Sequence, residues 1–250
     1  MNIKREGVLI IVALTLITGA TAQTISNVPK FELGASLAGF IYEGDLTPTA
    51  TGSARTMRPG VILYGSKIMS PVFLLRTNLA IGGLKGNDAL YDQPEFRKHR
   101  AFKFKTPLFE LSELLVWNPL GSNYKDRGFS PYLFGGVGLS FLHVRRDWSN
   151  FDAAYFGEAS ELPALITEDA AHKTPRVVPV IPLGIGLRYA VSPRIAINVE
   201  GAYRFSRNDY IDGFSKAANP ELADNYHSIS VGAVYRIGKK NTLDCPKVPW

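Results

Sequence analysis

The sequence predicts one all-β domain, an antiparallel up-and-down transmembrane β-barrel of about eight strands, of the outer-membrane type. Three observations predict it. The chain begins with the pattern of a secretory signal peptide, about eight later segments alternate apolar and polar residues, and the connections between them are alternately long and short. A helical membrane protein is excluded, because after the signal peptide no apolar run approaches the roughly 20 residues that a spanning helix needs.

The N-terminus has the three parts of a signal peptide. Lys4 and Arg5 precede an apolar run, Val8–Ile17, and Ala20-Thr21-Ala22 forms a small-residue cleavage site. No cysteine stands at this site, which argues against a lipoprotein anchor. We therefore expect three parts: a signal peptide at 1–22, the barrel at 23–238 and a periplasmic C-terminal tail at 239–250.

A period of two is clearest in Arg194–Ser206, where Ile195 and Ile197 lie on one face and Glu200 and Arg204 on the other. In a membrane barrel the apolar face contacts lipid and the polar face lines a lumen, where opposite charges can pair. Eight segments carry such a pattern: Phe31–Glu43, Arg58–Ile68, Val72–Leu84, Ala101–Trp117, Phe129–Val144, Val177–Ala190, Arg194–Ser206 and Tyr226–Gly238.

The first four segments differ in regularity. Phe31–Glu43 and Val72–Leu84 alternate clearly, whereas Arg58–Ile68 is more ambiguous. In the fourth segment the parity changes, because Glu110 and Glu113 lie an odd number of residues apart. We expect a β-bulge between them if both face the lumen.

The last four segments combine apolar residues on one face with glycine, serine or charge on the other, which a narrow lumen accepts. We expect a buried polar network that fills this lumen and leaves no channel. A secreted lipocalin-like barrel is the main structural alternative, but it would need an apolar interior. The residues predicted to form the network argue against that interior: Glu32, Arg76, Glu110, Arg188, Glu200, Arg204 and Arg236.

The connections set the orientation. Short links lie around Ser70-Pro71 and at 191–193, and an intermediate one at 118–128. The long links are 44–57, 85–100, 145–176 and 207–225. Outer-membrane barrels have short periplasmic turns and long extracellular loops. We therefore expect a cell outer-membrane location, extracellular long loops and periplasmic termini.

Aromatic residues near the strand ends are expected to form interfacial girdles. These are Tyr42, Trp117, Tyr124, Phe129, Tyr132, Tyr189, Phe205, Tyr210 and Tyr226.

The sequence indicates no enzyme, cofactor, small-molecule substrate or nucleic-acid partner. The formal net charge is +6, but the basic residues are scattered and no aromatic-basic motif appears. His227 and Ser228 could belong to a hydrolase triad, as could His143, but adjacent strand residues point to opposite faces. His99 and His172 have no second metal ligand at a convincing spacing.

Two short stretches stand out among the polar residues. In the last long loop, Asn208, Asp209 and Asp212 could ligate calcium, but their spacing is not that of an EF-hand. We expect a turn or loop-packing role for Asp45, Asp209, Tyr210 and Asp212. In the tail, the single cysteine excludes an internal disulfide framework. It indicates either an inert thiol or a contact with a periplasmic partner, formed by Asp244, Cys245, Pro246 and Lys247, in which Cys245 could form an intermolecular disulfide.

Five segments resemble the PorG family of outer-membrane β-barrels of Bacteroidota, in the same order along nearly all of the mature chain: Phe40–Leu46, Phe109–Glu113, Ser130–Leu139, Ile181–Tyr189 and Asn208–Ser215. The more specific pieces are Tyr-x-Gly-Asp-Leu, ending at Leu46, and Asp-Tyr-Ile-Asp-Gly-Phe-Ser, ending at Ser215.

This resemblance implies a non-enzymatic component of the type IX protein secretion machinery, in organisms that use it for protease secretion or gliding motility. It further implies outer-membrane lipid as environment, and as partners a PorK-like lipoprotein and a PorN-like ring protein. The alternative is an OmpA-like surface barrel that acts in adhesion or envelope integrity through its external loops. Tail truncation and loop deletion would distinguish the two.

Overall fold

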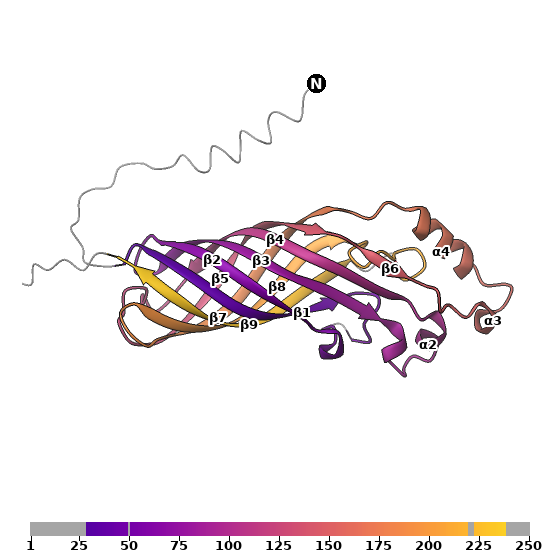
Figure 1. Ribbon diagram of the computed structural model, residues 1–250, viewed down its shortest axis with the longest axis horizontal. Helices are drawn as coiled ribbons and strands as arrows, with labels where there is room; N and C mark the ends of the chain where they lie inside the picture. Colours follow the sequence, from indigo (N-terminus) through magenta and orange to yellow (C-terminus); the bar gives the residue numbers. More distant parts are fainter. Residues whose placement is uncertain (1–28, 50, 220–222, 239–250) are drawn as a thin grey trace, which may run out of the picture. The chain divides into compact units, whose positions relative to one another are not determined.

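The computed structural model describes residues 29–49, 51–219 and 223–238. In this part of the chain, long antiparallel strands close into a barrel, because the first and the last long strands of the sheet order, Phe73–Asn87 and Lys103–Trp117, also pair with each other (Figure 1). Its strands are β1 (Phe31–Glu43), β2 (Arg58–Ile68), β3 (Phe73–Asn87), β4 (Lys103–Trp117), β5 (Gly128–Leu142), β7 (Val177–Ala190), β8 (Ile195–Asn208) and β9 (Asp224–Ile237). The predicted fold class is confirmed.

The short elements all lie in the long connections, at the same end of the barrel (Figure 1). They are η1 (Ala54–Thr56), η2 (Asp88–Leu90), α2 (Phe96–Arg100), β6 (Arg145–Asp147), α3 (Ala153–Phe156) and α4 (Leu162–Ala171). Among the described residues, no helix has the length and apolar character to cross a membrane.

Three strands have the predicted bounds, namely β1, β2 and β7, and the other five differ by one to three residues at an end. The largest difference is in β3, which continues beyond Leu84 to Asn87. It does so because its pairing with β4 extends to Asn87 opposite Lys103.

The predicted bulge in β4 is wrong. The register of β4 against β3 and β5 is unbroken from Thr77 opposite Glu113 to Ala80 opposite Glu110. The two glutamates therefore point to opposite sides of the barrel wall: Glu110 is buried inside, and Glu113 lies outside, where the Thr77 hydroxyl donates to it at 2.7 Å. A register shift occurs instead in β8, between Arg204 and Asn208.

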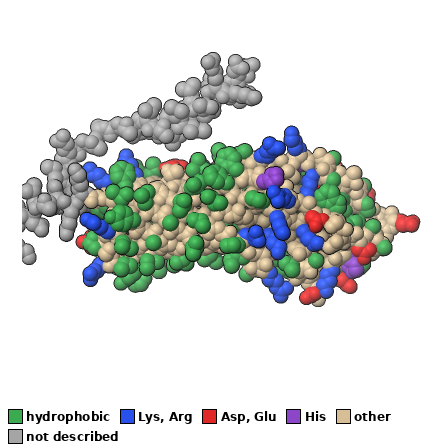
Figure 2. Space-filling model, viewed as in Figure 1, with side chains coloured by type: hydrophobic (Ala, Val, Ile, Leu, Met, Phe, Trp, Pro, Cys, Tyr) green, Lys and Arg blue, Asp and Glu red, His purple; other side chains and the backbone are tan. Residues whose placement is uncertain are grey.

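The outer surface of the barrel is apolar. Odd-numbered strand residues such as Leu37, Val137, Ile185 and Ile229 are more than half exposed, whereas their even-numbered neighbours are mostly buried or half-buried. Figure 2 shows hydrophobic side chains over the middle of the barrel, with Lys and Arg gathered toward its two ends. This is the reverse of a water-soluble barrel, which buries its apolar face.

The predicted aromatic girdles are only partly present. Outward-facing aromatics do lie near some strand ends: Phe129 and Tyr189 pack together at one end, with ring centroids 4.7 Å apart. Phe141 lies near the other end of β5, and its ring is 5.7 Å from that of Phe109, which is in the middle of β4. In contrast, Tyr42, Tyr132 and Tyr226 are buried in the interior, because their even-numbered positions face the lumen.

Candidate functional site

The lumen at the short-turn end is closed by one carboxylate between two arginines. Both terminal nitrogens of Arg188, on β7, donate to Glu32, on β1, at 2.9 Å. Arg236, on β9, lies 3.3 Å from the same carboxylate and donates to the Lys125 carbonyl at 2.7 Å. A strand-to-strand network therefore extends here to the β4–β5 connection.

The middle of the lumen holds a second ion pair. Arg76, on β3, contacts Glu200, on β8, at 2.6 Å. The Tyr132 hydroxyl and the Asn198 amide also donate to Glu200. The Arg76 guanidinium lies over the Tyr64 ring, 4.5 Å from its centroid, which adds a cation–π contact. The rings of Tyr64 and Tyr132 thus pack beside this ion pair in the lumen.

The third ion pair lies toward the long-loop end. Arg204, on β8, contacts Glu110, on β4, at 3.2 Å, and the Tyr226 hydroxyl donates to Glu110 at 2.9 Å. Arg204 also donates to the Ser228 hydroxyl and lies over the Phe40 ring.

The structure places every residue of the predicted network in the lumen, each exposed by 5% or less: Glu32, Arg76, Glu110, Arg188, Glu200, Arg204 and Arg236. Four arginines face three glutamates, and each carboxylate bonds to at least one guanidinium. Removing one partner of a buried pair leaves an uncompensated charge, which is strongly destabilising. A shift in strand register would separate these pairs, so the network opposes such a shift. It also occupies the path that a solute would take.

A second polar cluster lies where the lumen meets the long loops. The Tyr42 hydroxyl, on β1, contacts the carboxylates of both Asp212 and Asp224, at 2.7 Å in the case of Asp212. A tyrosine hydroxyl has one proton to donate, so one of the two carboxyls must itself supply a proton. Burial raises the pKa of Asp212 well above its ordinary value, which favours this protonated form.

The other predicted loop residues surround this cluster. Asp45 accepts a hydrogen bond from the Asn219 backbone at 2.9 Å, and burial raises the pKa of Asp45 to about 7. Burial also raises the pKa of Asp209. The Tyr210 backbone donates to the Asn208 side chain at 2.9 Å, which forms an Asx turn.

Two further carboxylates organise the loops, and neither was predicted. Asp169, on α4, accepts from the backbone N–H groups of Ser215, Lys216 and Ala217 at 2.9 to 3.1 Å. Asp88, on η2, contacts Arg100 at 2.6 Å. Their partners lie far along the chain or on a short helix, and no local pattern marks them.

Among the described residues, no group of three or more His, Cys, Asp or Glu side chains is arranged to hold a metal ion. The loop carboxylates instead face a tyrosine hydroxyl and backbone N–H groups. The tail residues Asp244, Cys245, Pro246 and Lys247 lie outside the described residues.

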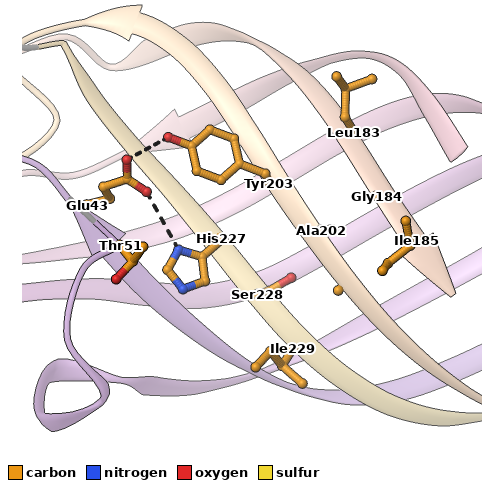
Figure 3. A pocket seen from close by; sticks show the side chains of 11 residues that line it. Glu43, Thr51, Leu183, Gly184, Ile185, Ala202, Tyr203, His227, Ser228 and Ile229 are labelled. Atoms are coloured by element: carbon orange, nitrogen blue, oxygen red, sulfur yellow. Dashed lines mark hydrogen bonds and ion pairs between the residues drawn. The ribbon is translucent and has the colours of Figure 1, made fainter. Parts of the chain in front are cut away.

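The histidines take part in packing and exposed contacts. Figure 3 shows Tyr203 and His227 pointing toward Glu43 in an outward-facing groove of about 420 Å³. The Tyr203 hydroxyl donates to Glu43 at 2.8 Å, and His227 lies 4.0 Å from it. Ser228 faces the lumen and Arg204, so His227 and Ser228 point to opposite faces as predicted.

The loop histidines His99 and His172 stack on tyrosines. The His99 ring lies 3.7 Å from that of Tyr155, and the His172 ring lies 3.9 Å from that of Tyr210. His143 is exposed at the end of β5.

Comparisons with known proteins give one family and several similar folds. A family model described as Domain of unknown function (DUF6089) matches residues 7–236. No curated protein matches the chain. Similar solved structures include Neisserial surface protein A, at 14% identity and a TM-score of 0.46, covering 86% of this chain and 100% of that one.

Two further similar structures are the attachment invasion locus protein Ail of Yersinia pestis and the outer membrane enzyme PagL. Ail has 11% identity and a TM-score of 0.44 over 84% of this chain and 99% of its own. PagL has 11% identity and a TM-score of 0.41 over 82% and 99%.

Proposed function

The chain belongs to the DUF6089 family, and we propose that it is a non-enzymatic, non-conducting barrel of the outer membrane that acts as an anchor for other proteins. The membrane location is supported by the height of the apolar surface. On the outward face of β4, Phe109 and Trp117 are eight residues apart, roughly 26 Å along the strand and about 20 Å along a tilted barrel axis. That height suits the apolar band of an outer-membrane barrel.

The filled lumen is the observation that carries this proposal. Arginine and glutamate side chains from β1, β3, β4, β7, β8 and β9 meet across the interior at three successive levels. An eight-stranded barrel has an interior that side chains can fill, and here the side chains are ion-paired as well. A barrel without a path for solutes acts through its surfaces, by binding lipids or other proteins.

The resemblance to the PorG family gives the finer form of the proposal. The chain links a periplasmic ring of PorK-like and PorN-like proteins to the outer membrane, as part of the type IX secretion machinery. The long loops then face outward, and both termini, with the tail at 239–250, face the ring.

A second candidate function is that of an OmpA-like surface barrel acting through its external loops. The packing of those loops favours it. Arg146, on β6, donates to the carbonyls of Gly213, Ala170 and His172 at 2.7 to 3.0 Å, and so joins two long loops. Loops that are held together in this way present a defined surface to a partner.

A pull-down from native envelopes in mild detergent tests the first proposal. The full chain is compared with one that ends at Gly238, and with the loop variant Arg146→Met as a matched control. We expect PorK-like and PorN-like proteins with the full chain and with Arg146→Met, but not with the shortened chain. If the folded full chain recovers neither ring protein, the secretion role is wrong and the surface-barrel function takes its place.

A further inference from the structure

Three cations stand in one row on the outside of the barrel, where β3, β4 and β6 meet. Lys85 lies directly opposite Lys105 in the β3–β4 ladder, and Lys105 lies directly opposite Arg145 in the β4–β6 ladder. Like charges placed directly opposite each other on one face of a sheet destabilise it. The row therefore has an unfavourable energy unless an anion lies against it.

No side chain of the described residues supplies that anion. Within the described part of the chain, no carboxylate forms an ion pair with Lys85, Lys105 or Arg145. The nearest acid in the ladder, Asp147, is opposite Lys103 and accepts a hydrogen bond from the Ser149 backbone at 2.9 Å. Asp147 remains charged, but it is the one acid in a lining that also contains five cations, Lys85, Lys103, Lys105, Arg145 and Arg146, so the charge beside the row stays strongly positive.

The position of β6 is itself held by the loop structure. Arg146 points inward and bonds to three loop carbonyls, so its neighbours Arg145 and Asp147 are turned outward. The cations line a groove of about 400 Å³, and Gly86 belongs to the same lining. That volume gives room for a phosphate group with part of a headgroup.

The row lies at a definite height on the barrel. On the outward face of β4, Lys105 is four residues from Phe109, toward the long loops. Four residues correspond to roughly 13 Å along a strand and about 10 Å along the axis of a tilted barrel. If the aromatic pair Phe109 and Phe141 marks the edge of the apolar band, the cations lie at the level of the lipid headgroups. Figure 2 shows Lys and Arg side chains gathered near the long-loop end.

We propose that Lys85, Lys105 and Arg145 bind a phosphate group of an outer-leaflet lipid. This inference rests on the proposed outer-membrane location with the long loops outside. A phosphate has several acceptor oxygens, so it can contact more than one of the cations that line this groove. A lipid places its phosphate at this height, while its acyl chains lie against the apolar wall of the barrel. Lys103 and its partner Asp147 border the same groove.

Native mass spectrometry of the full mature chain in detergent tests the site. The probes are diphosphoryl lipid A, the same lipid without phosphates, and inorganic phosphate alone. Because a cation near a charged membrane surface contributes about 1 kcal/mol, each of Lys85→Gln, Lys105→Gln and Arg145→Gln should weaken binding of diphosphoryl lipid A about five-fold, and the triple variant roughly 100-fold. The matched control is Lys67→Gln, because Lys67 also faces outward but lies on β2 at the short-turn end of the barrel, away from the row. This control should leave the affinity for diphosphoryl lipid A unchanged.

Thermal unfolding gives a second readout, which a purely structural role would not produce. Without lipid, Lys105→Gln should raise the melting temperature, because it removes the central charge of the row. With diphosphoryl lipid A, the same variant should gain less stability than the unsubstituted chain. Heat-modifiable migration on gels confirms that each variant is folded.

Three results would overturn the proposal. These are equal binding of the dephosphorylated lipid, displacement of the lipid by millimolar inorganic phosphate, and an equal loss of binding in Lys67→Gln. Protease access to the 145–176 loop in intact cells tests the orientation separately. A failure of the outer-membrane proposal would therefore appear there, and a failure of the phosphate site would appear in the binding assay.

Discussion

Replacement of Glu32 by Gln tests how much the lumen network stabilises the barrel. Glu32 is fully buried and is the only carboxylate in ion-pair contact with Arg188 and Arg236 among the described residues. Glutamine keeps the shape but removes the charge, so two buried guanidinium groups lose their counter-ion. Breaking a buried pair by removing one partner costs roughly 3–5 kcal/mol, and with two arginines affected we expect the upper part of that range.

Urea unfolding in phosphatidylcholine vesicles measures this free energy. Glu113→Gln is the matched control, because it makes the same chemical change on the outside of the wall, where the Thr77 hydroxyl is the partner. We expect a change below about 1 kcal/mol for this control. In Glu32→Gln, the further change Arg188→Met should restore part of the stability, because it removes one of the unpaired charges. If Glu32→Gln loses less than about 1 kcal/mol, the network is not the main stabilising element of the interior.

Three other predictions concern the loops and the outer surface. Burial raises the pKa of Asp45 from 3.8 to about 7, so the folded protein holds this proton more tightly than the unfolded chain does. The contribution of Asp45 to the free energy of unfolding should be fully present below about pH 4 and should be lost as the pH rises through 7. In thermal unfolding between pH 5 and 8, Asp45→Asn should lose less stability over this range than the unsubstituted chain. Arg146→Met removes bonds to three loop carbonyls and should speed proteolysis of the 145–176 loop several-fold without changing the melting of the barrel. Glu113→Leu replaces an acid in the middle of the outward face of β4 and should stabilise the barrel by about 1–2 kcal/mol in vesicles; a loss of stability would contradict the assigned orientation of that side chain.

The barrel and its lumen could be predicted because a period of two is a local property. Once Ile195 and Ile197 are assigned to the outside, Glu200 and Arg204 must face inward, whatever the rest of the chain does. The same rule, applied strictly, would have placed Glu113 outside. The predicted bulge assumed that an acid avoids the lipid-facing surface, and the unbroken pairing with β3 overrides that preference.

The partners within the lumen could not be predicted. Arg76 and Glu200 lie on strands that are not neighbours in the sheet, and their contact depends on the diameter of the closed barrel. The positions of several aromatic residues were also predicted wrongly. Tyr132 and Tyr226 lie near strand ends, but they hydrogen-bond to lumen carboxylates, so their position along the strand indicated a girdle and their parity indicated the interior.

The loops were predictable only as long connections. The role of Asp169 depends on a short helix in one loop meeting three successive backbone N–H groups of another, 46 to 48 residues away. The cluster around Tyr42 likewise joins a strand end to two carboxylates more than 150 residues later. Such contacts follow from the closed barrel, which brings the strand ends together, and no local pattern encodes them.

Conductance of the purified mature chain in a planar lipid bilayer tests the central claim most directly. Because ion pairs close the lumen at three levels, we expect no current above the background of the bilayer. Stable, reproducible conductance steps from the folded barrel would contradict a filled lumen, and with it the proposal that this protein acts through its surfaces.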